Sequence, residues 1–107
     1  MLQEIYVIDD KIELEEKLKK MFEQEKEYRI TKVAKEDLDI ALKNIPSLII
    51  VNENDDTENN IQICKKIKYN EDNSITPIII ISNNKEHSHK LEMLELGVLY
   101  YIRLPID

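Results

Sequence analysis

Two runs of consecutive apolar residues, at positions 48–51 and 78–81, constrain the fold of this chain most strongly. Neither run alternates with polar residues, so a strand formed from either one has no face suited to water. Strands buried on both faces are typical of parallel sheets, in which a helical crossover joins successive strands. The stretches between the runs carry apolar residues at helical spacing, as at Leu14 and Leu18. The pattern therefore predicts an α/β domain with helices on both faces of a parallel sheet.

Five strands and four helices are expected in alternation along residues 1–107, which we take as one domain. The strands are predicted at residues 5–8, 28–33, 47–51, 77–81 and 99–102. The helices are predicted at residues 11–25 and 36–44, near 61–67 after a polar loop at 52–60, and around Leu91 and Leu94 before Gly97. Right-handed crossovers make this a doubly wound sheet. The chain ends where a fifth helix is expected to begin, so one sheet face should be thinly covered.

Composition excludes several kinds of site. A single glycine rules out the glycine-rich loops that hold phosphates or dinucleotides, and one cysteine with two histidines cannot complete a Cys/His zinc site. The formal charge of −7 argues against nucleic acid or an anionic membrane as a direct partner, because both bind through Lys and Arg. We expect no nucleic-acid binding by this domain.

The sequence also bears on location. Residues 1–25 lack the basic start and apolar stretch of a secretory signal, and the longest apolar runs are too short to span a bilayer. A lone cysteine favours a reducing compartment. We therefore expect a cytoplasmic protein without membrane association.

Polar side chains gather where the predicted strands end, which is where doubly wound sheets carry their sites. Asp9 and Asp10 follow the first strand, Asn52 the third and Ser82 the fourth, while Leu104 follows the fifth. Two interpretations fit the adjacent carboxylates. They hold a hard cation such as Mg²⁺, or they cap the first helix.

These segments, in this order, resemble a response-regulator receiver domain from position 5 to position 107. The matching stretches are IYVIDD at 5–10, PSLIIVN at 46–52, PIIIISN at 77–83 and the segment from Gly97 through Tyr101 to Pro105. Residues 63–68 are similar to the third helix of receivers that precede diguanylate cyclase domains. The resemblance implies a flavodoxin-like sheet with strand order 2-1-3-4-5.

Receivers accept a phosphoryl group from a histidine kinase onto an aspartate, beside a magnesium ion held by an acidic pair. A hydroxyl residue and a lysine bind the phosphoryl oxygens, and an aromatic residue changes rotamer. By resemblance, Asp9 and Asp10 match the acidic pair, Ser82 the hydroxyl position and Tyr101 the switch aromatic.

Two positions depart from this pattern. Asn52 occupies the phosphoacceptor position, and an amide is not the carboxylate nucleophile that an acyl phosphate requires. Leu104 occupies the position of the lysine and offers no charge to a phosphoryl oxygen. The loss of one carboxylate also predicts weak Mg²⁺ binding by Asp9 and Asp10, so no cofactor is expected to be required.

Several residues have a plain structural interpretation beside a functional one. Glu53 and Asp55 are expected to be solvated loop acids, although Asp55 or another acid nearby is the alternative phosphoacceptor. We expect Tyr101 to be an ordinary amphipathic strand residue rather than a working switch. His87 and His89 are predicted to be exposed.

The sequence thus predicts a degenerate receiver, a non-phosphorylatable module that regulates by binding rather than by catalysis. Its partner would be an attached or separate output domain, or a second copy bound through the face of helix four and strand five, where Leu99, Tyr100 and Ile102 are apolar. The alternative function is a phosphorelay receiver that uses an acid such as Asp55.

Overall fold

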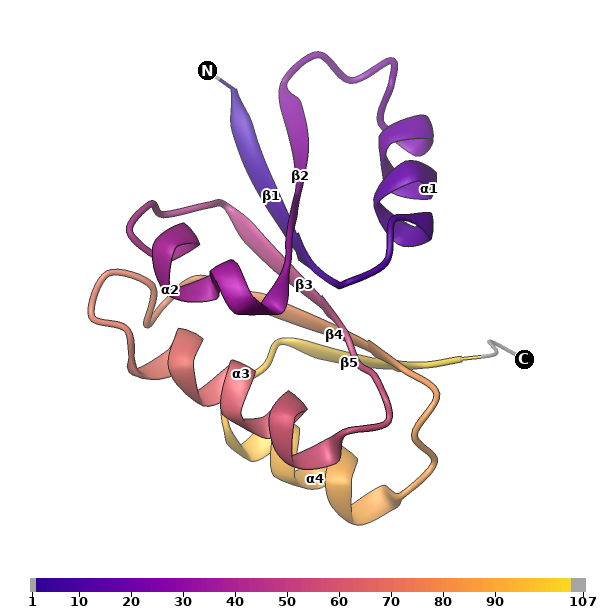
Figure 1. The fold of residues 1–107 in the computed structure, drawn as a ribbon, viewed down its shortest axis with the longest axis vertical. Helices are drawn as coiled ribbons and strands as arrows, with labels where there is room; N and C mark the ends of the chain where they lie inside the picture. Colours follow the sequence, from indigo (N-terminus) through magenta and orange to yellow (C-terminus); the bar gives the residue numbers. More distant parts are fainter. Residues whose placement is uncertain (1, 105–107) are drawn as a thin grey trace.

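The computed structural model describes residues 2–104, in which helices pack on both faces of a five-stranded sheet (Figure 1). The strands are β1 (Gln3–Ile8), β2 (Tyr28–Val33), β3 (Leu48–Asn52), β4 (Ile78–Ser82) and β5 (Tyr100–Arg103). The helices are α1 (Glu13–Met21), α2 (Leu38–Ala41), α3 (Thr57–Tyr69) and α4 (His87–Glu95), and a 3-10 turn, η1 (Lys35–Asp37), precedes α2. Each neighbouring pair of strands is parallel, and the order is β2-β1-β3-β4-β5. The predicted fold and strand order are confirmed.

The two faces of the sheet are covered unequally. The larger core lies between the sheet and α2, α3 and α4; it is formed by Tyr6, Ile8, Val33, Leu38, Leu42, Ile49, Val51, Ile61, Ile63, Cys64, Ile67, Ile78, Ile80, Met93, Val98 and Tyr101. The smaller core, built on Ile5, Val7, Ile30 and Ile50, packs against α1. Figure 1 shows α1 on one side of the sheet and α2, α3 and α4 on the other.

The thinly covered part of the sheet is the side of β4 and β5 that faces the same way as α1. Ile79 and Ile81 are only half-buried there, and their register partners Tyr100 and Ile102 are exposed. Paired residues on parallel neighbours point to the same face, so these four side chains form one apolar strip. The thin coverage expected from the sequence is confirmed for the described residues.

Several local expectations are wrong. The first helix ends at Met21 rather than at residue 25, and the Met21 side chain is exposed. The polar stretch after β3 is shorter than predicted, because the Asp56 side chain accepts a hydrogen bond from the Asn59 amide and α3 begins at Thr57. On α4 the buried residues are His89 and Met93, whereas Leu91 and Leu94, around which the helix was predicted, are exposed.

Gly97 ends the segment after α4, as predicted. Its φ of 100° lies in the left-handed region that other residues rarely adopt, and its amide donates to the Leu94 carbonyl. No helix among residues 2–104 is both long and apolar enough to cross a membrane.

Candidate functional site

A cleft of about 300 Å³ lies at the carboxyl ends of β1 and β3. Its lining consists of Asp9, Asp10, Lys11, Lys35, Asn52, Glu53, Asn54, Asp55 and Asn83. Parallel strands bring their carboxyl ends to one edge, which is why residues more than forty positions apart meet here. The structure therefore brings together the acidic pair, Asn52 and Asp55 in one place.

The centre of the cleft is a contact between Asp9 and Asn52. The Asn52 Nδ2–H donates a hydrogen bond of 2.9 Å to Asp9 Oδ2, and the Lys11 amide donates to Asp9 Oδ1 at 3.1 Å. Asp9 is buried, so both contacts satisfy a carboxylate that water reaches poorly. Helix α1 starts at Glu13 without a side-chain cap, so the helix-capping interpretation of the acidic pair is wrong.

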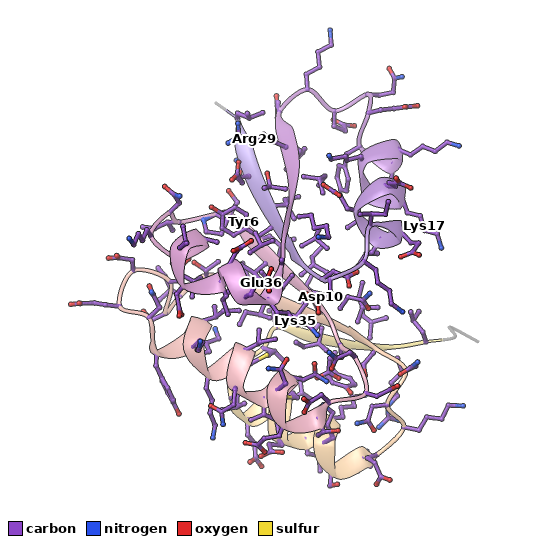
Figure 2. All side chains as sticks on the ribbon, viewed as in Figure 1. Tyr6, Asp10, Lys17, Arg29, Lys35 and Glu36 are labelled. Atoms are coloured by element: carbon purple, nitrogen blue, oxygen red, sulfur yellow. The ribbon has the colours of Figure 1, made fainter. Side chains whose placement is uncertain are left out.

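The cleft lining also includes a lysine, Lys35, that the sequence did not single out. Lys35, in η1 after β2, lines the cleft, and its backbone amide donates to Asp10 Oδ1 at 3.3 Å. Figure 2 shows Asp10 and Lys35 lying next to each other. Asp10 itself is exposed. Lys35 thus offsets part of the negative charge of this edge.

Ser82 and Leu104 lie together at the far end of the same edge. The Leu104 amide donates to the Ser82 carbonyl at 2.7 Å, and Leu104 is 40% exposed. The Ser82 hydroxyl is buried and accepts from the Asn84 amide at 3.0 Å. The structure therefore places Leu104, an apolar residue, directly beside Ser82. Pro105 lies outside the described residues.

The donor set bears on metal binding. Within residues 2–104, no three His, Cys, Asp or Glu side chains are grouped so as to hold a metal ion. The amide N–H of Asn52, rather than an oxygen, faces Asp9 Oδ2. A hard cation needs oxygen ligands, so this arrangement does not fit Mg²⁺ between the two side chains.

Behind the cleft, three polar side chains meet in the core. Glu53 Oε2 lies 2.9 Å from His89 Nε2, and the Tyr101 hydroxyl donates to Glu53 Oε1 at 3.1 Å. The side chains of His89 and Glu53 are 4% and 1% exposed. The expectations that Glu53 is solvated and that His89 is exposed are therefore wrong. That Tyr101 is an ordinary amphipathic strand residue rather than a working switch stays a prediction. His87 and Asp55 are exposed, as predicted.

Burial changes the acidity of two groups in this region. Desolvation is the main reason why the pKa of Tyr101 is raised to about 12, and the charge of Glu53 acts in the same direction. Desolvation, followed by the charge of Glu53, raises the pKa of the Cys64 thiol to about 12. Both groups are neutral at physiological pH. Cys64 is fully buried, so its role in this structure is packing.

One sequence pattern pointed to the buried histidine. His89 precedes Met93 by four residues and therefore shares its helical face, so a choice of Met93 rather than the leucines as the inward residue would have placed His89 inside. Glu53 carries no such pattern, because it directly follows the strand and begins a run of polar residues.

A family model matches this chain in sequence, and solved structures resemble it in fold. The family described as the response regulator receiver domain matches residues 5–107. No curated protein matches the chain in sequence.

Three solved structures illustrate the similarity in fold. A signal receiver domain of a histidine kinase from Clostridium thermocellum superposes with a TM-score of 0.85 at 22% identity, covering 100% of this chain and 89% of that one. The chemotaxis response regulator CheY4 of Vibrio cholerae gives 0.80 at 18% identity, covering 100% and 90%. The receiver domain of a sensor histidine kinase from Pseudomonas aeruginosa, solved with magnesium coordinated in its active-site cleft, gives 0.72 at 20% identity, covering 100% and 88%.

Proposed function

The chain belongs to the response regulator receiver domain family, and we propose that it is a degenerate member, a regulatory module that works without accepting a phosphoryl group. The observation that carries the proposal is the hydrogen bond from Asn52 Nδ2 to Asp9 Oδ2. In this arrangement the tip of β3 presents an amide where the family carries its phosphoacceptor. On this proposal residues 1–107 form one receiver-like unit without enzymatic turnover.

The chemistry of two side chains supports the proposal. A neutral amide is a poor nucleophile toward a phosphoryl group, and no acyl phosphate forms on it. Leu104, next to Ser82, supplies no positive charge to a phosphoryl oxygen. Lys35 lines the part of the cleft near the acidic pair, where its backbone amide donates to Asp10 Oδ1. We infer that the site has lost both the group that reacts and the group that stabilises the product.

The same contact argues that no metal cofactor is required. Asp9 and Asp10 are present, but Asn52 stands where the family has its third carboxylate. Asp9 Oδ2 already accepts a hydrogen bond from Asn52. Each carboxylate removed from an oxygen site lowers its affinity for a hard cation. We propose that Mg²⁺ binds weakly and that the module functions without it.

A module without chemistry acts by binding. We propose a protein partner, either an attached or a separate output domain, or a second copy of the chain bound through α4 and β5. Leu99, Tyr100 and Ile102 are 54%, 60% and 36% exposed, which supports an apolar contact. The charge of −7 supports a cytoplasmic protein partner over nucleic acid or a membrane surface. Sedimentation at high concentration tests the second copy, and a monomer throughout would remove it.

Intact-mass measurement after incubation with acetyl phosphate and Mg²⁺ tests the proposed function. We expect no gain of phosphoryl mass on the wild-type chain. A variant carrying Asn52→Asp and Leu104→Lys restores both lost groups and is the positive control, in which we expect a labile phosphoryl adduct. A phosphoryl gain on the wild-type chain would overturn the proposal.

The alternative acceptor is Asp55, because it lines the same cleft as Asn52 and is exposed. If the wild-type chain does gain mass, the variant Asp55→Asn decides between acceptors. Loss of the adduct in that variant would assign the chain to a phosphorelay receiver that uses Asp55.

A further inference from the structure

Side chains from three separate elements converge on one carboxylate behind the cleft. Glu53 follows β3, His89 lies on α4 and Tyr101 on β5. His89 Nε2 lies 3.1 Å and 2.9 Å from the two Glu53 oxygens, and the Tyr101 hydroxyl donates to Oε1 at 3.1 Å. The His89 and Tyr101 rings also contact edge to face, with centroids 5.7 Å apart. We call Glu53, His89 and Tyr101 the buried triad.

The carboxylate is the centre of this triad. Its side chain is 1% exposed, so its charge is tolerated only where donors replace water. His89 Nδ1 is buried without a partner among residues 2–104, so the contact of Nε2 with Glu53 is what orients the ring. Nε2 is therefore the ring nitrogen that faces the Glu53 carboxylate and can donate to it. The same carboxylate orients both rings.

We propose that Glu53 is a built-in latch that holds Tyr101 in its buried rotamer and ties the tip of β3 to α4 and β5. Tyr101 is 8% exposed, whereas its neighbour Tyr100, on the other face of β5, is 60% exposed. A phenol hydroxyl in the core needs a hydrogen-bond partner; Glu53 accepts from it, and Ser82 is its second polar neighbour. The α4 and β5 surface is thereby kept in one conformation by a residue of the chain itself.

The regulatory role of the latch rests on the proposed function. A chain that takes no phosphoryl group needs another means of holding its α4 and β5 surface in one conformation. The geometry of the latch is independent of phosphorylation. A phosphoryl gain in the mass experiment would overturn the degenerate receiver and leave the latch standing. An unlatched Tyr101 would overturn the latch and leave the mass result unchanged.

The test follows the exposure of Tyr101 by NMR of the chain labelled with ¹³C in its tyrosine rings. The chain has five tyrosines, and Tyr101→Phe identifies the relevant signal. Relaxation caused by a soluble gadolinium chelate reports how far each ring is exposed. Tyr69, which is 76% exposed, and Tyr100 provide the exposed reference. In the wild-type chain we expect Tyr101 to be shielded and free of exchange.

Glu53→Met removes the acceptor while nearly keeping the side-chain volume. We expect the gadolinium effect on Tyr101 to rise severalfold toward the level of Tyr100, with the other tyrosines unchanged. Glu53→Gln retains a weaker neutral acceptor, so we expect an intermediate effect with microsecond-to-millisecond exchange at Tyr101. Glu58→Met, at an exposed acid on α3, is the matched control and should leave Tyr101 shielded.

Two results would overturn the latch. One is a folded Glu53→Met variant in which Tyr101 stays as shielded as in the wild-type chain, which would mean that packing holds the ring. If Glu53→Met does not fold, the Glu53→Gln variant decides, because absence of exchange at Tyr101 there has the same meaning. The second is a wild-type Tyr101 as exposed as Tyr100.

Discussion

Asn52 and Glu53 are consecutive residues at the end of β3, yet their side chains lie in two different environments, a solvent-accessible cleft and the buried core. Asn52 lies in the cleft, half-buried, and donates to Asp9. Glu53 has its carboxylate in the core, between His89 and Tyr101. The tip of β3 therefore places a neutral amide in the cleft and a carboxylate in the core.

The difference shows where polar groups affect the fold most. In the cleft, water and Lys35 screen the acids, so single changes there alter chemistry more than stability. In the core, the charge of Glu53 is balanced by two specific donors, so a change there leaves a group without a partner. The predictions below compare the two regions, beginning with the largest effect.

The largest effect is expected from His89→Ala, which leaves Glu53 buried without its imidazole partner. A buried acceptor left without its donor costs about 1–3 kcal/mol, and more for a charged group, so we expect a loss of about 3 kcal/mol in urea unfolding. The control is Lys66→Ala, which removes an exposed pair with Asp39 at 3.5 Å and should change stability by less than about 0.5 kcal/mol. Equal losses in the two variants would contradict the distinction between core and surface.

Alkaline pH should lower the stability of the fold through groups in the core rather than through groups in the cleft. The pKa values of Cys64 and Tyr101 are raised from 9.0 and 10.0 to about 12 in the folded chain, mainly by burial. The unfolded chain therefore releases these protons at lower pH, so their contribution to stability is complete below pH 9 and is lost as pH rises toward 12. The cleft lining holds no thiol or phenol.

Denaturation midpoints measured from pH 8 to 12 check this effect. The Cys64→Ala variant should show no thiol-dependent loss between pH 9 and 10, where the wild-type chain begins to weaken. An identical pH slope in the two proteins over that interval would show that the thiol does not contribute.

The sheet was largely predictable from the sequence, because burial on both faces leaves a direct trace in residues 48–51 and 78–81. The cleft was predictable as well, since parallel strands bring Asp9 and Asn52 to one edge whatever the loops do. The resemblance assigned Asn52 and Leu104 to two positions of the receiver site, and the structure places Asn52 beside Asp9 and Leu104 beside Ser82.

The buried triad was not predictable in the same way. Glu53 and His89 each appear among polar neighbours, and a polar residue in such a stretch is usually solvated. Each of these two side chains turns inward because of the other, which lies 36 residues away in the sequence. A local sequence pattern does not contain that information. The start of α3 was missed for a related reason, because a helix capped by Asp56 begins in residues without an apolar face.

Asn52→Asp tests the cleft and should have a smaller effect on stability than His89→Ala. The new carboxylate replaces a donor with a second charge beside Asp9, so we expect a loss of about 1–2 kcal/mol without metal. Millimolar Mg²⁺ should restore most of this loss, because three acids then surround the cation. Thermal unfolding with and without Mg²⁺ measures both steps. Stabilisation of the wild-type chain by Mg²⁺ to the same extent would contradict the loss of the metal site.

The smallest effect is expected from Asp55→Asn, two residues after Glu53. Asp55 is exposed in the cleft, and no protein hydrogen bond to its side chain is present among residues 2–104. A substitution at such a surface position changes stability by less than about 0.5 kcal/mol. The informative comparison is Glu53→Gln, which weakens two buried contacts and should destabilise by about 1–3 kcal/mol. Both variants change one carboxylate to its amide. Any difference between their unfolding midpoints therefore reflects the surroundings of the carboxylate, buried or exposed, rather than the chemical change. Equal midpoints would mean that the Glu53 carboxylate is no more important to the fold than a solvated loop acid.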